Sequence, residues 1–245
     1  MTELAPASPW AGRWTKMVTV CGIGAALIAL IGSYGSGFGF WPFTVGFLFI
    51  GVAIVLALLT LIASPLALWK AGRAAFGNRG FLLGLVCALG FVGVMGYWIN
   101  RGSNAPMIHD VTTDLANPPA FQKLSVRADN LVGVGTIEKW RELHAGSYAD
   151  LRPVTLTATP AQAITKIEAL VRARGWDVAL VAPDRVEATD TASPFKFKDD
   201  VVITVTPVEG GQQSIVNMRS VSRVGMGDLG VNAARIQAFM ADLAK

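Results

Sequence analysis

Two long stretches of the chain contain no charged residue and are mostly apolar. From Met17 to Trp69 there is no Asp, Glu, Lys, Arg or His, and Gly80–Asn100 is equally free of them. A soluble domain cannot keep that much apolar surface dispersed in water, whereas about 20 apolar residues suffice for a helix to cross a bilayer. The first stretch is too long for one crossing, and the glycine-rich segment Ser33–Pro42 divides it. The pattern therefore predicts a three-helix transmembrane anchor with spans at about residues 17–33, 42–63 and 81–99.

The basic residues beside these spans predict their orientation. Arg13 and Lys16 precede the first span, the loop between the first two spans has no charge, and the loop before the third contains Lys70, Arg73 and Arg79. Lys and Arg are retained on the cytoplasmic side of a membrane. We therefore expect a cytoplasmic N-terminus and an extracytoplasmic segment 101–245, which in a bacterium means the inner membrane and the periplasm.

A cleaved signal peptide is the alternative interpretation of the first span. No good A-x-A cleavage site follows it. Even if it were cleaved, the two remaining spans would keep their orientation, and the segment after them would lie on the same side of the membrane. The location of residues 101–245 is thus the same under both interpretations.

The spans themselves contain no ionisable residue, whereas a pore or proton relay usually keeps one at depth. Small residues recur at helical spacing, in the pair Gly22 and Ala26 and in the series Gly80, Gly84 and Ala88. Such spacing lets helix backbones approach closely, within one chain or between copies. The expected partners of the spans are therefore the lipid bilayer, one another and other copies of the chain.

The net charge of +4 does not indicate nucleic-acid binding. Residues 101–245 contain sixteen basic and sixteen acidic side chains, so the surplus belongs to the residues beside the spans, where it favours anionic lipid headgroups. Both cysteines, Cys21 and Cys87, lie in spans. The segment after the anchor therefore has no thiolate to hold a metal, and we expect neither a metal nor another cofactor there.

After a polar linker at residues 101–107, residues 108–245 have the length and pattern of one α+β domain. Residues 108–121 are expected to be irregular, and residues 122–151 to hold only a turn or two of helix near Ile137–Leu143. Thr159-Pro160-Ala161-Gln162 is a capping box that begins a helix, and Gly175 ends it. The predicted order is β-α-β-β-β-β-α, an antiparallel sheet with two helices on one face, with strands at 154–157, 176–182, 185–190, 201–206 and 214–224 and a last helix from Asp228.

Four segments together resemble a known family, namely Ile108–Phe121, Tyr148–Pro153, Asp199–Val205 and Arg219–Ile236. They are similar to the bacterial and plastid family called domain of unknown function 1499, and Ala149-Asp150-Leu151 stands where Pro-Asp-Ile is expected. Some members of that family look similar in also having a three-span N-terminal anchor. The resemblance implies a membrane-associated envelope domain and brings no established activity with it.

Polar residues gather near the C-terminal end. Arg219 and Arg223 are expected on one side of a strand, and a helix from Asp228 would place Asn232 and Arg235 on the same flank as Asp228. Carboxylates expected to meet them are Asp110, Asp114 and the neighbouring pair Asp199 and Asp200. The cluster is either a network of ion pairs that stabilises the fold or a site where arginines bind a carboxylate or phosphate.

No motif in the domain predicts catalysis. His109 and His144 are the only histidines, too few for a typical catalytic metal site, and Ser220 and Ser222 lack a G-x-S-x-G elbow. The expected function is an envelope interaction or structural module that contacts other envelope proteins and is not an enzyme. The alternatives are a domain that binds a small anion or a lipid, and an envelope hydrolase.

Overall fold

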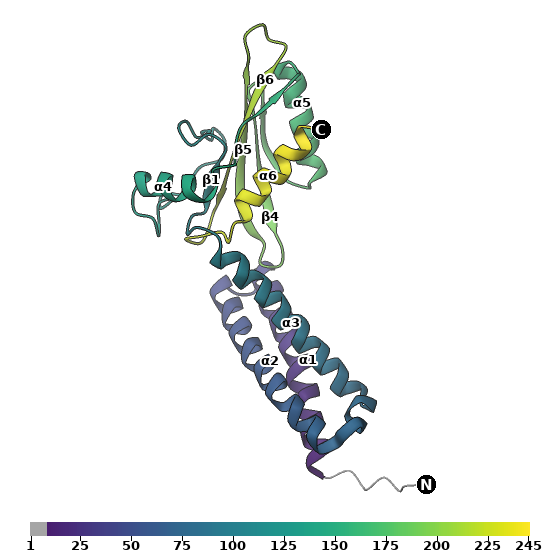
Figure 1. Ribbon diagram of the computed structural model, residues 1–245. Helices are drawn as coiled ribbons and strands as arrows, with labels where there is room; N and C mark the ends of the chain where they lie inside the picture. Colours follow the sequence, from purple (N-terminus) through teal and green to yellow (C-terminus); the bar gives the residue numbers. More distant parts are fainter. Residues whose placement is uncertain (1–8) are drawn as a thin grey trace. The chain divides into compact units, whose positions relative to one another are not determined.

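The computed structural model describes residues 9–245, with side chains from Gly12 onward (Figure 1). Two compact units are present. One contains the chain through Ile99 together with Ser193–Lys196, and the other contains Asn100–Ala192 and Phe197–Lys245. The last turn of the third long helix thus belongs to the second unit.

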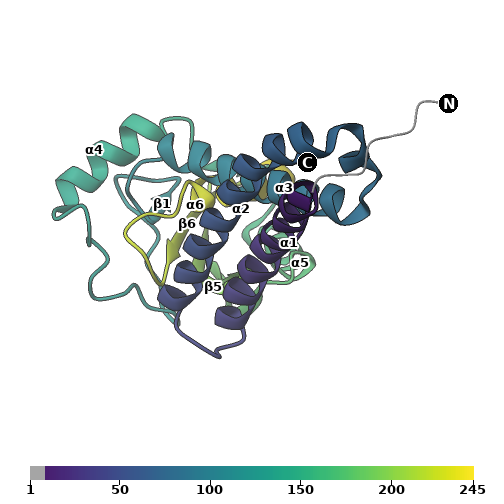
Figure 2. The same ribbon diagram turned by 90° about the horizontal axis from the view of Figure 1, so that it is seen from below.

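The first unit is built from three long helices, α1 (Pro9–Gly37), α2 (Phe43–Ala71) and α3 (Arg79–Ser103), with a 3₁₀ helix, η1 (Gly72–Gly77), between α2 and α3. Figure 2 shows the three running alongside one another. Each is long and apolar enough to cross a membrane, over 12–37, 43–77 and 79–103. The three predicted helices are confirmed, and each extends beyond its predicted span.

The helix α2 passes through Pro65 instead of ending at Ala63 as predicted. A proline inside a helix removes one backbone hydrogen bond, and serine or threonine side chains nearby often compensate in apolar surroundings. Here the hydroxyl groups bond within the helix, Thr60 Oγ1 to the Leu56 carbonyl at 2.8 Å and Ser64 Oγ to the Thr60 carbonyl at 2.7 Å. Both hydroxyl groups are buried and bonded one turn back along the helix, so they add no unsatisfied polar group beside Pro65.

Small residues fill the interior of this unit, and large apolar residues cover its surface. A Cβ added to Gly22 would lie 2.0 Å from the Gly84 carbonyl oxygen, so the backbones of α1 and α3 are in contact there. The buried residues around this contact include Ala25, Ala29, Ala53, Ala57 and Ala88. Leu30, Leu48, Leu58, Ile62, Leu83 and Val86 are all more than half exposed. This arrangement, small inside and large outside, is typical of helices packed in lipid.

The second unit is organised around a six-stranded antiparallel sheet with the order β1-β6-β5-β4-β3, in which β2 also pairs with β6. The strands are β1 (Asp110–Thr112), β2 (Val154–Leu156), β3 (Asp177–Ala182), β4 (Arg185–Ala192), β5 (Phe197–Pro207) and β6 (Ser214–Ser222). The helices are α4 (Ile137–Ser147), α5 (Pro160–Ala173) and α6 (Val231–Leu243). In Figure 1, α5 and α6 cover one face of the sheet, while α4 lies beside β1.

The predicted α+β architecture is confirmed, including its local signals. Thr159 and Gln162 form the capping box of α5, and Gly175 follows the helix with a φ of +71°. The core lies between the sheet and the two helices, where α5 and α6 present apolar stripes to β4, β5 and β6. Within it, the rings of Trp176 and Phe239 stack with their centroids 5.6 Å apart.

Three local predictions needed correction. The segment expected to be irregular contains β1, and α4 is a full helix instead of a turn or two. The strand β1 has only three residues and two are polar, so its pairing with β6, not its own pattern, makes it a strand. The last helix begins at Val231, not Asp228, because Leu229 and Gly230 have φ values of +54° and +75° that no α-helix contains.

Candidate functional site

The predicted polar cluster is divided between the two faces of the sheet. Neighbouring residues of a strand point to opposite faces, so Asp199 and Asp200 of β5 cannot act together. The side chains of Arg219 and Arg223 share the face of Asp200, as expected, and this face is opposite α5 and α6. Asp199 and Arg235 meet on the face that the helices cover.

On the face of the sheet opposite α5 and α6, which we call the open face, Arg219 links β6 to β1. Its Nε and Nη2 atoms donate to the two carboxylate oxygens of Asp110 at 2.9 and 2.6 Å, and Nη1 donates to the Pro119 carbonyl at 3.2 Å. Asn130 Nδ2 donates to the same carboxylate at 2.6 Å. The Asp110 carboxylate is buried, and several donors satisfy it. Its bidentate pair with Arg219 joins two strands that are distant in the sequence.

Arg223 forms the second pair on that face. It donates from Nε and Nη2 to Asp200, both at 2.8 Å, and Thr189 Oγ1 donates to the same carboxylate at 2.7 Å. The Arg223 side chain is 43% exposed whereas that of Asp200 is 6% exposed. Its hydrogen bond to Asp200 raises the pKa of the Arg223 guanidinium above its usual value. The pair therefore neutralises a buried carboxylate from the solvent side.

Glu187 is a buried carboxylate on this face that the sequence did not reveal. It lies at the centre of β4, fully buried, in register with Val202 and, through β5, with Arg219. Its oxygens accept the backbone N–H groups of Gln122 at 2.6 Å, Lys123 at 3.0 Å and Leu124 at 2.8 Å. Glu187 thus fixes the irregular segment 122–124 over the sheet, and only the tertiary structure brings these groups together.

On the helix-covered face, Arg235 is the centre of the other network. It donates from Nε to Asp190 at 2.9 Å, from Nη2 to Asp199 at 2.5 Å and from Nη1 to Ser220 Oγ at 3.0 Å. A further bond joins Nη1 to the Asn232 side-chain oxygen. Arg235 and Asp199 are each 6% exposed at their side chains. Among the ion pairs of the described residues, the Arg235–Asp199 pair is the most deeply buried, and the Arg235 network connects α6 to β4, β5 and β6.

Asn232 and Asp228 complete this network. The Asn232 amide donates to the His109 carbonyl at 3.0 Å and to Ser222 Oγ at 2.9 Å, and it accepts from Ser220 Oγ at 2.6 Å. Asp228 accepts the backbone N–H groups of Gly230 at 2.9 Å and Asn232 at 2.7 Å, so it caps the start of α6. Burial raises the pKa of the Asp228 carboxyl, and these backbone bonds partly oppose that shift.

Asp114 is separate from both networks. Its carboxylate accepts the N–H groups of Ala116 at 3.1 Å and Asn117 at 2.9 Å, the geometry of a local turn. His109 Nε2 lies 3.1 Å from Asn130 Oδ1. Within residues 9–245, no three His, Cys, Asp or Glu side chains gather in a way that would hold a metal ion.

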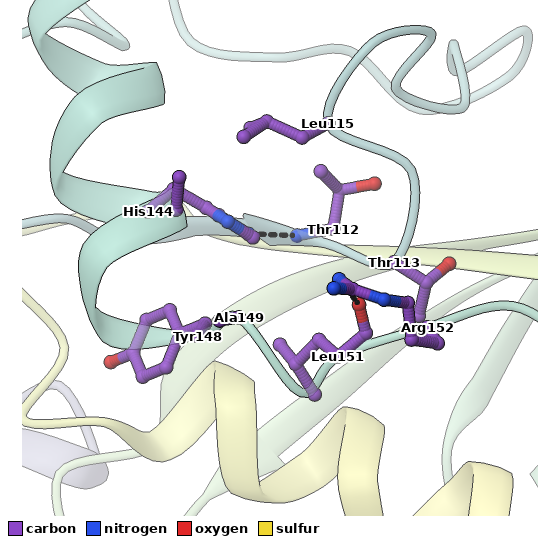
Figure 3. A pocket seen from close by; sticks show the side chains of 9 residues that line it. Thr112, Thr113, Leu115, His144, Tyr148, Ala149, Leu151 and Arg152 are labelled. Carbon is purple, nitrogen blue, oxygen red and sulfur yellow. Dashed lines mark hydrogen bonds between the residues drawn. The ribbon is translucent and has the colours of Figure 1, made fainter.

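A small pocket of about 150 Å³ lies between α4 and β1. Figure 3 shows its lining, which combines polar side chains such as His144 and Arg152 with the apolar Leu115 and Leu151. The lining residues are Thr112, Thr113, Leu115, His144, Ala145, Tyr148, Ala149, Leu151 and Arg152. Two of the four segments that carry the family resemblance, Ile108–Phe121 and Tyr148–Pro153, contribute to it.

His144 and Arg152 are the nitrogen-bearing side chains of this pocket. His144 Nε2 accepts the Thr112 N–H at 3.1 Å, which places the proton of the neutral ring on Nδ1. Burial lowers the pKa of His144, so the neutral ring is favoured. Arg152 donates to the Leu151 carbonyl at 3.2 Å, and no carboxylate among the described residues forms an ion pair with it. The pocket therefore has an uncompensated positive charge at its edge.

The comparison with known families agrees with the fold and with these segments. A family described as protein of unknown function (DUF1499) matches residues 110–243, more than half of the chain. The chain belongs to this family. Among curated proteins, no match was found. The DUF1499 region includes both charged networks and the pocket, and the resemblance predicted from the four segments is confirmed.

The partners of the predicted arginines were only partly foreseeable. Asp190 lies directly opposite Asp199 in the β4–β5 hairpin, and a correct strand register would have predicted that both reach the same arginine. Asn130 and Thr189 had no signal, because an isolated polar residue in an irregular segment or a strand is usually solvated. The face to which each carboxylate points follows from strand alternation, and this alone would have separated Asp199 from Asp200.

Proposed function

We propose that this DUF1499 protein is a multi-pass protein of the bacterial inner membrane whose residues 101–245 form a periplasmic module. The distribution of Lys and Arg supports a cytoplasmic N-terminus and a cytoplasmic loop between α2 and α3. The observation that carries the proposal is the packing of the first unit, with alanine and glycine inside and large apolar side chains outside. Such a surface is stable only in lipid.

Alkaline phosphatase fusions test the orientation, because this enzyme is active only outside the cytoplasm. A fusion after Asn104 should be active, and a fusion after Gly77 should be inactive although it is expressed at a similar level. The reverse pattern would overturn the orientation.

We further propose that the module serves as an interaction or structural element of the envelope. Support comes from the buried charges, which pair with one another. Arg235 binds Asp190 and Asp199 and so joins α6 to the sheet. Arg219 binds Asp110 and so joins β6 to the edge strand β1. Arginines that are paired in this way stabilise a rigid scaffold. The scaffold, held at the membrane by its anchor, presents its surface to partners.

In-membrane photo-crosslinking with mass spectrometry tests this role. A photoreactive amino acid at exposed Gln212 or Val181 of the module should give the same discrete protein adducts in independent preparations. A matched probe at Gly77 should not give these adducts. Adducts with lipid alone, or with many abundant proteins at random, would argue against an interaction module.

Binding of a small anion is the second candidate, and the charge of Arg152 at the pocket favours it. The guanidinium and the Nδ1–H of His144 are donors suited to a carboxylate. A volume of about 150 Å³ suits a small organic anion, since a cavity of roughly this size holds one benzene molecule. In calorimetric titrations of the full chain with acetate or phosphate, Arg152→Ala should abolish binding while the exposed Arg141→Ala leaves it intact. Equal binding by both variants would exclude the pocket.

A further inference from the structure

Four large apolar side chains are exposed together in the second unit. Met107, Met226 and Leu229 are 59%, 53% and 44% exposed, and Val224 is also exposed. They come from two segments that lie side by side, because the Asp228 N–H donates to the Ile108 carbonyl at 3.2 Å. In addition, a Cβ on Gly227 would lie 2.9 Å from the Met107 sulfur. We call Met107, Val224, Met226 and Leu229 the apolar loop.

The apolar loop is attached to the end of α3 by side-chain hydrogen bonds. Arg101, in the last turn of that helix, donates from Nε to the Leu229 carbonyl at 2.8 Å and from Nη2 to the Gly230 carbonyl at 2.9 Å. Gly102 packs so closely that an added Cβ would lie 2.7 Å from a Leu229 methyl group. All these residues belong to the second unit, so the attachment is internal to it.

The position of Arg101 along α3 locates the loop with respect to lipid. Arg101 directly follows the uncharged stretch Gly80–Asn100, whose length matches the ~20 residues that cross a bilayer core. An arginine at that point lies at the headgroup level. Because Arg101 bonds directly to the backbone of residues 229 and 230, the apolar loop is within a side chain's length of the same level.

Leu229 provides a second, independent indication. Its φ of +54° is in the left-handed region, which residues other than glycine rarely adopt. The core does not explain this choice, since the side chain is 44% exposed. Part of the side chain packs on Gly102, and the rest is an apolar surface exposed beside the end of α3.

We infer that the apolar loop inserts into the interfacial region of the bilayer from which α3 emerges. The inference depends on the membrane anchor proposed above. The partner of the apolar loop is lipid. Its Met and Leu side chains exchange contact with water for contact with acyl chains, and this burial of apolar surface drives the insertion. Insertion should therefore be insensitive to salt and to the fraction of anionic lipid.

Spin-label accessibility in the full chain tests this inference. With Cys21 and Cys87 replaced by Ser, single cysteines at Met226 and Leu229 would be labelled after reconstitution into phosphatidylcholine–phosphatidylglycerol nanodiscs. Matched reference sites are Val94, in the middle of α3, and Gln212, in the turn after β5. We expect collision with a water-soluble nickel complex to be at least threefold lower at 226 and 229 than at 212, at both low and high salt.

The outcomes separate this inference from the anchor. If Val94 is protected by lipid but Met226 and Leu229 are as accessible to nickel as Gln212, the loop does not insert and the anchor stands. If Val94 is accessible too, both proposals fail. As a second variant that relieves the backbone, Leu229→Gly should raise nickel accessibility at a label on Met226, and an unchanged value would count against insertion.

Discussion

Removing Arg235 should destabilise the second unit far more than removing Arg223. Both arginines pair with carboxylates whose side chains are 6% exposed, but Arg235 is itself 6% exposed while Arg223 is 43% exposed. Arg235→Ala leaves two carboxylates without a cation: Asp190, which is 27% exposed and can be solvated, and Asp199, which is buried and which water does not readily reach. Breaking a buried pair in this way costs about 3–5 kcal/mol. At Arg223, solvent can reach the vacated position, so the cost should be nearer the roughly 1–3 kcal/mol of an unsatisfied buried acceptor.

These energies predict distinct melting temperatures. In a domain of this size, 1 kcal/mol shifts the Tm by roughly 3–4 °C, so Arg235→Ala should lower it by about 9–20 °C and Arg223→Ala by roughly 3–12 °C. The change of about 3–5 kcal/mol is a large part of the ~5–15 kcal/mol that stabilises a typical domain. Residues 105–245 contain only two tryptophans, Trp140 and Trp176, and both are buried, so their fluorescence reports unfolding.

A double-mutant cycle identifies the interaction. Adding Asp199→Ala to Arg235→Ala should cost less than the two single changes together, because the second change removes a charge that the first left unpaired. If Arg235→Ala or Arg223→Ala melts at or above the parent temperature, the corresponding network is not structural. Its arginines would then have to be treated as a binding site for an anion.

Three further predictions concern other parts of the chain. Residues 105–245 expressed alone should be soluble and unfold cooperatively without reductant, whereas an aggregated or molten product would show that the helices supply part of the core. Gly84→Ile should lower the melting temperature of the detergent-solubilised chain, while Gly93→Ile, which has open space at its Cβ, should not, and equal effects would contradict the close helix contact. Burial lowers the folded pKa of His144, so below the unfolded value of about 6.5 only the unfolded chain gains the proton. The urea concentration at the unfolding midpoint should therefore decrease as the pH is lowered from 7.5 to 5, and it should decrease less for His144→Gln. Parallel curves of midpoint against pH for the two proteins would refute this.

The sequence was most informative where one local pattern determines the structure. The absence of charge predicts the three helices, and the Thr159–Gln162 capping box predicts the start of α5, because each depends on neighbouring residues alone. Helix α4 was underestimated for a related reason. Its buried face consists of Trp140 and His144, and a histidine does not look like part of an apolar stripe until its Nε2 is seen to accept the Thr112 N–H.

The candidate site was less predictable because it depends on register and on contacts between distant segments. The sequence identified Arg219, Arg223 and Arg235 as the residues that matter electrostatically, but it placed them in one cluster. Which carboxylate each one meets depends on strand alternation and on the pairing of β4, β5 and β6. The role of Glu187 was hidden entirely, since its partners are backbone N–H groups of a segment without a regular pattern.

The loop before α6 has two roles that explain its sequence. On one side, the Asp228 carboxylate holds the N–H groups of Gly230 and Asn232, and Asn232 contacts Arg235 in the buried network. On the other, the carbonyls of Leu229 and Gly230 accept from Arg101 at the end of α3. A regular helix starting at Asp228 would use the Leu229 carbonyl in its own hydrogen bonds. Because residues 229 and 230 are left-handed, α6 starts later: the Gly230 carbonyl accepts its first bond, from the Ala234 N–H at 3.2 Å, while the Leu229 carbonyl bonds to Arg101 instead. A local departure from helical geometry thus links the start of α6 to the last turn of α3 within the second unit.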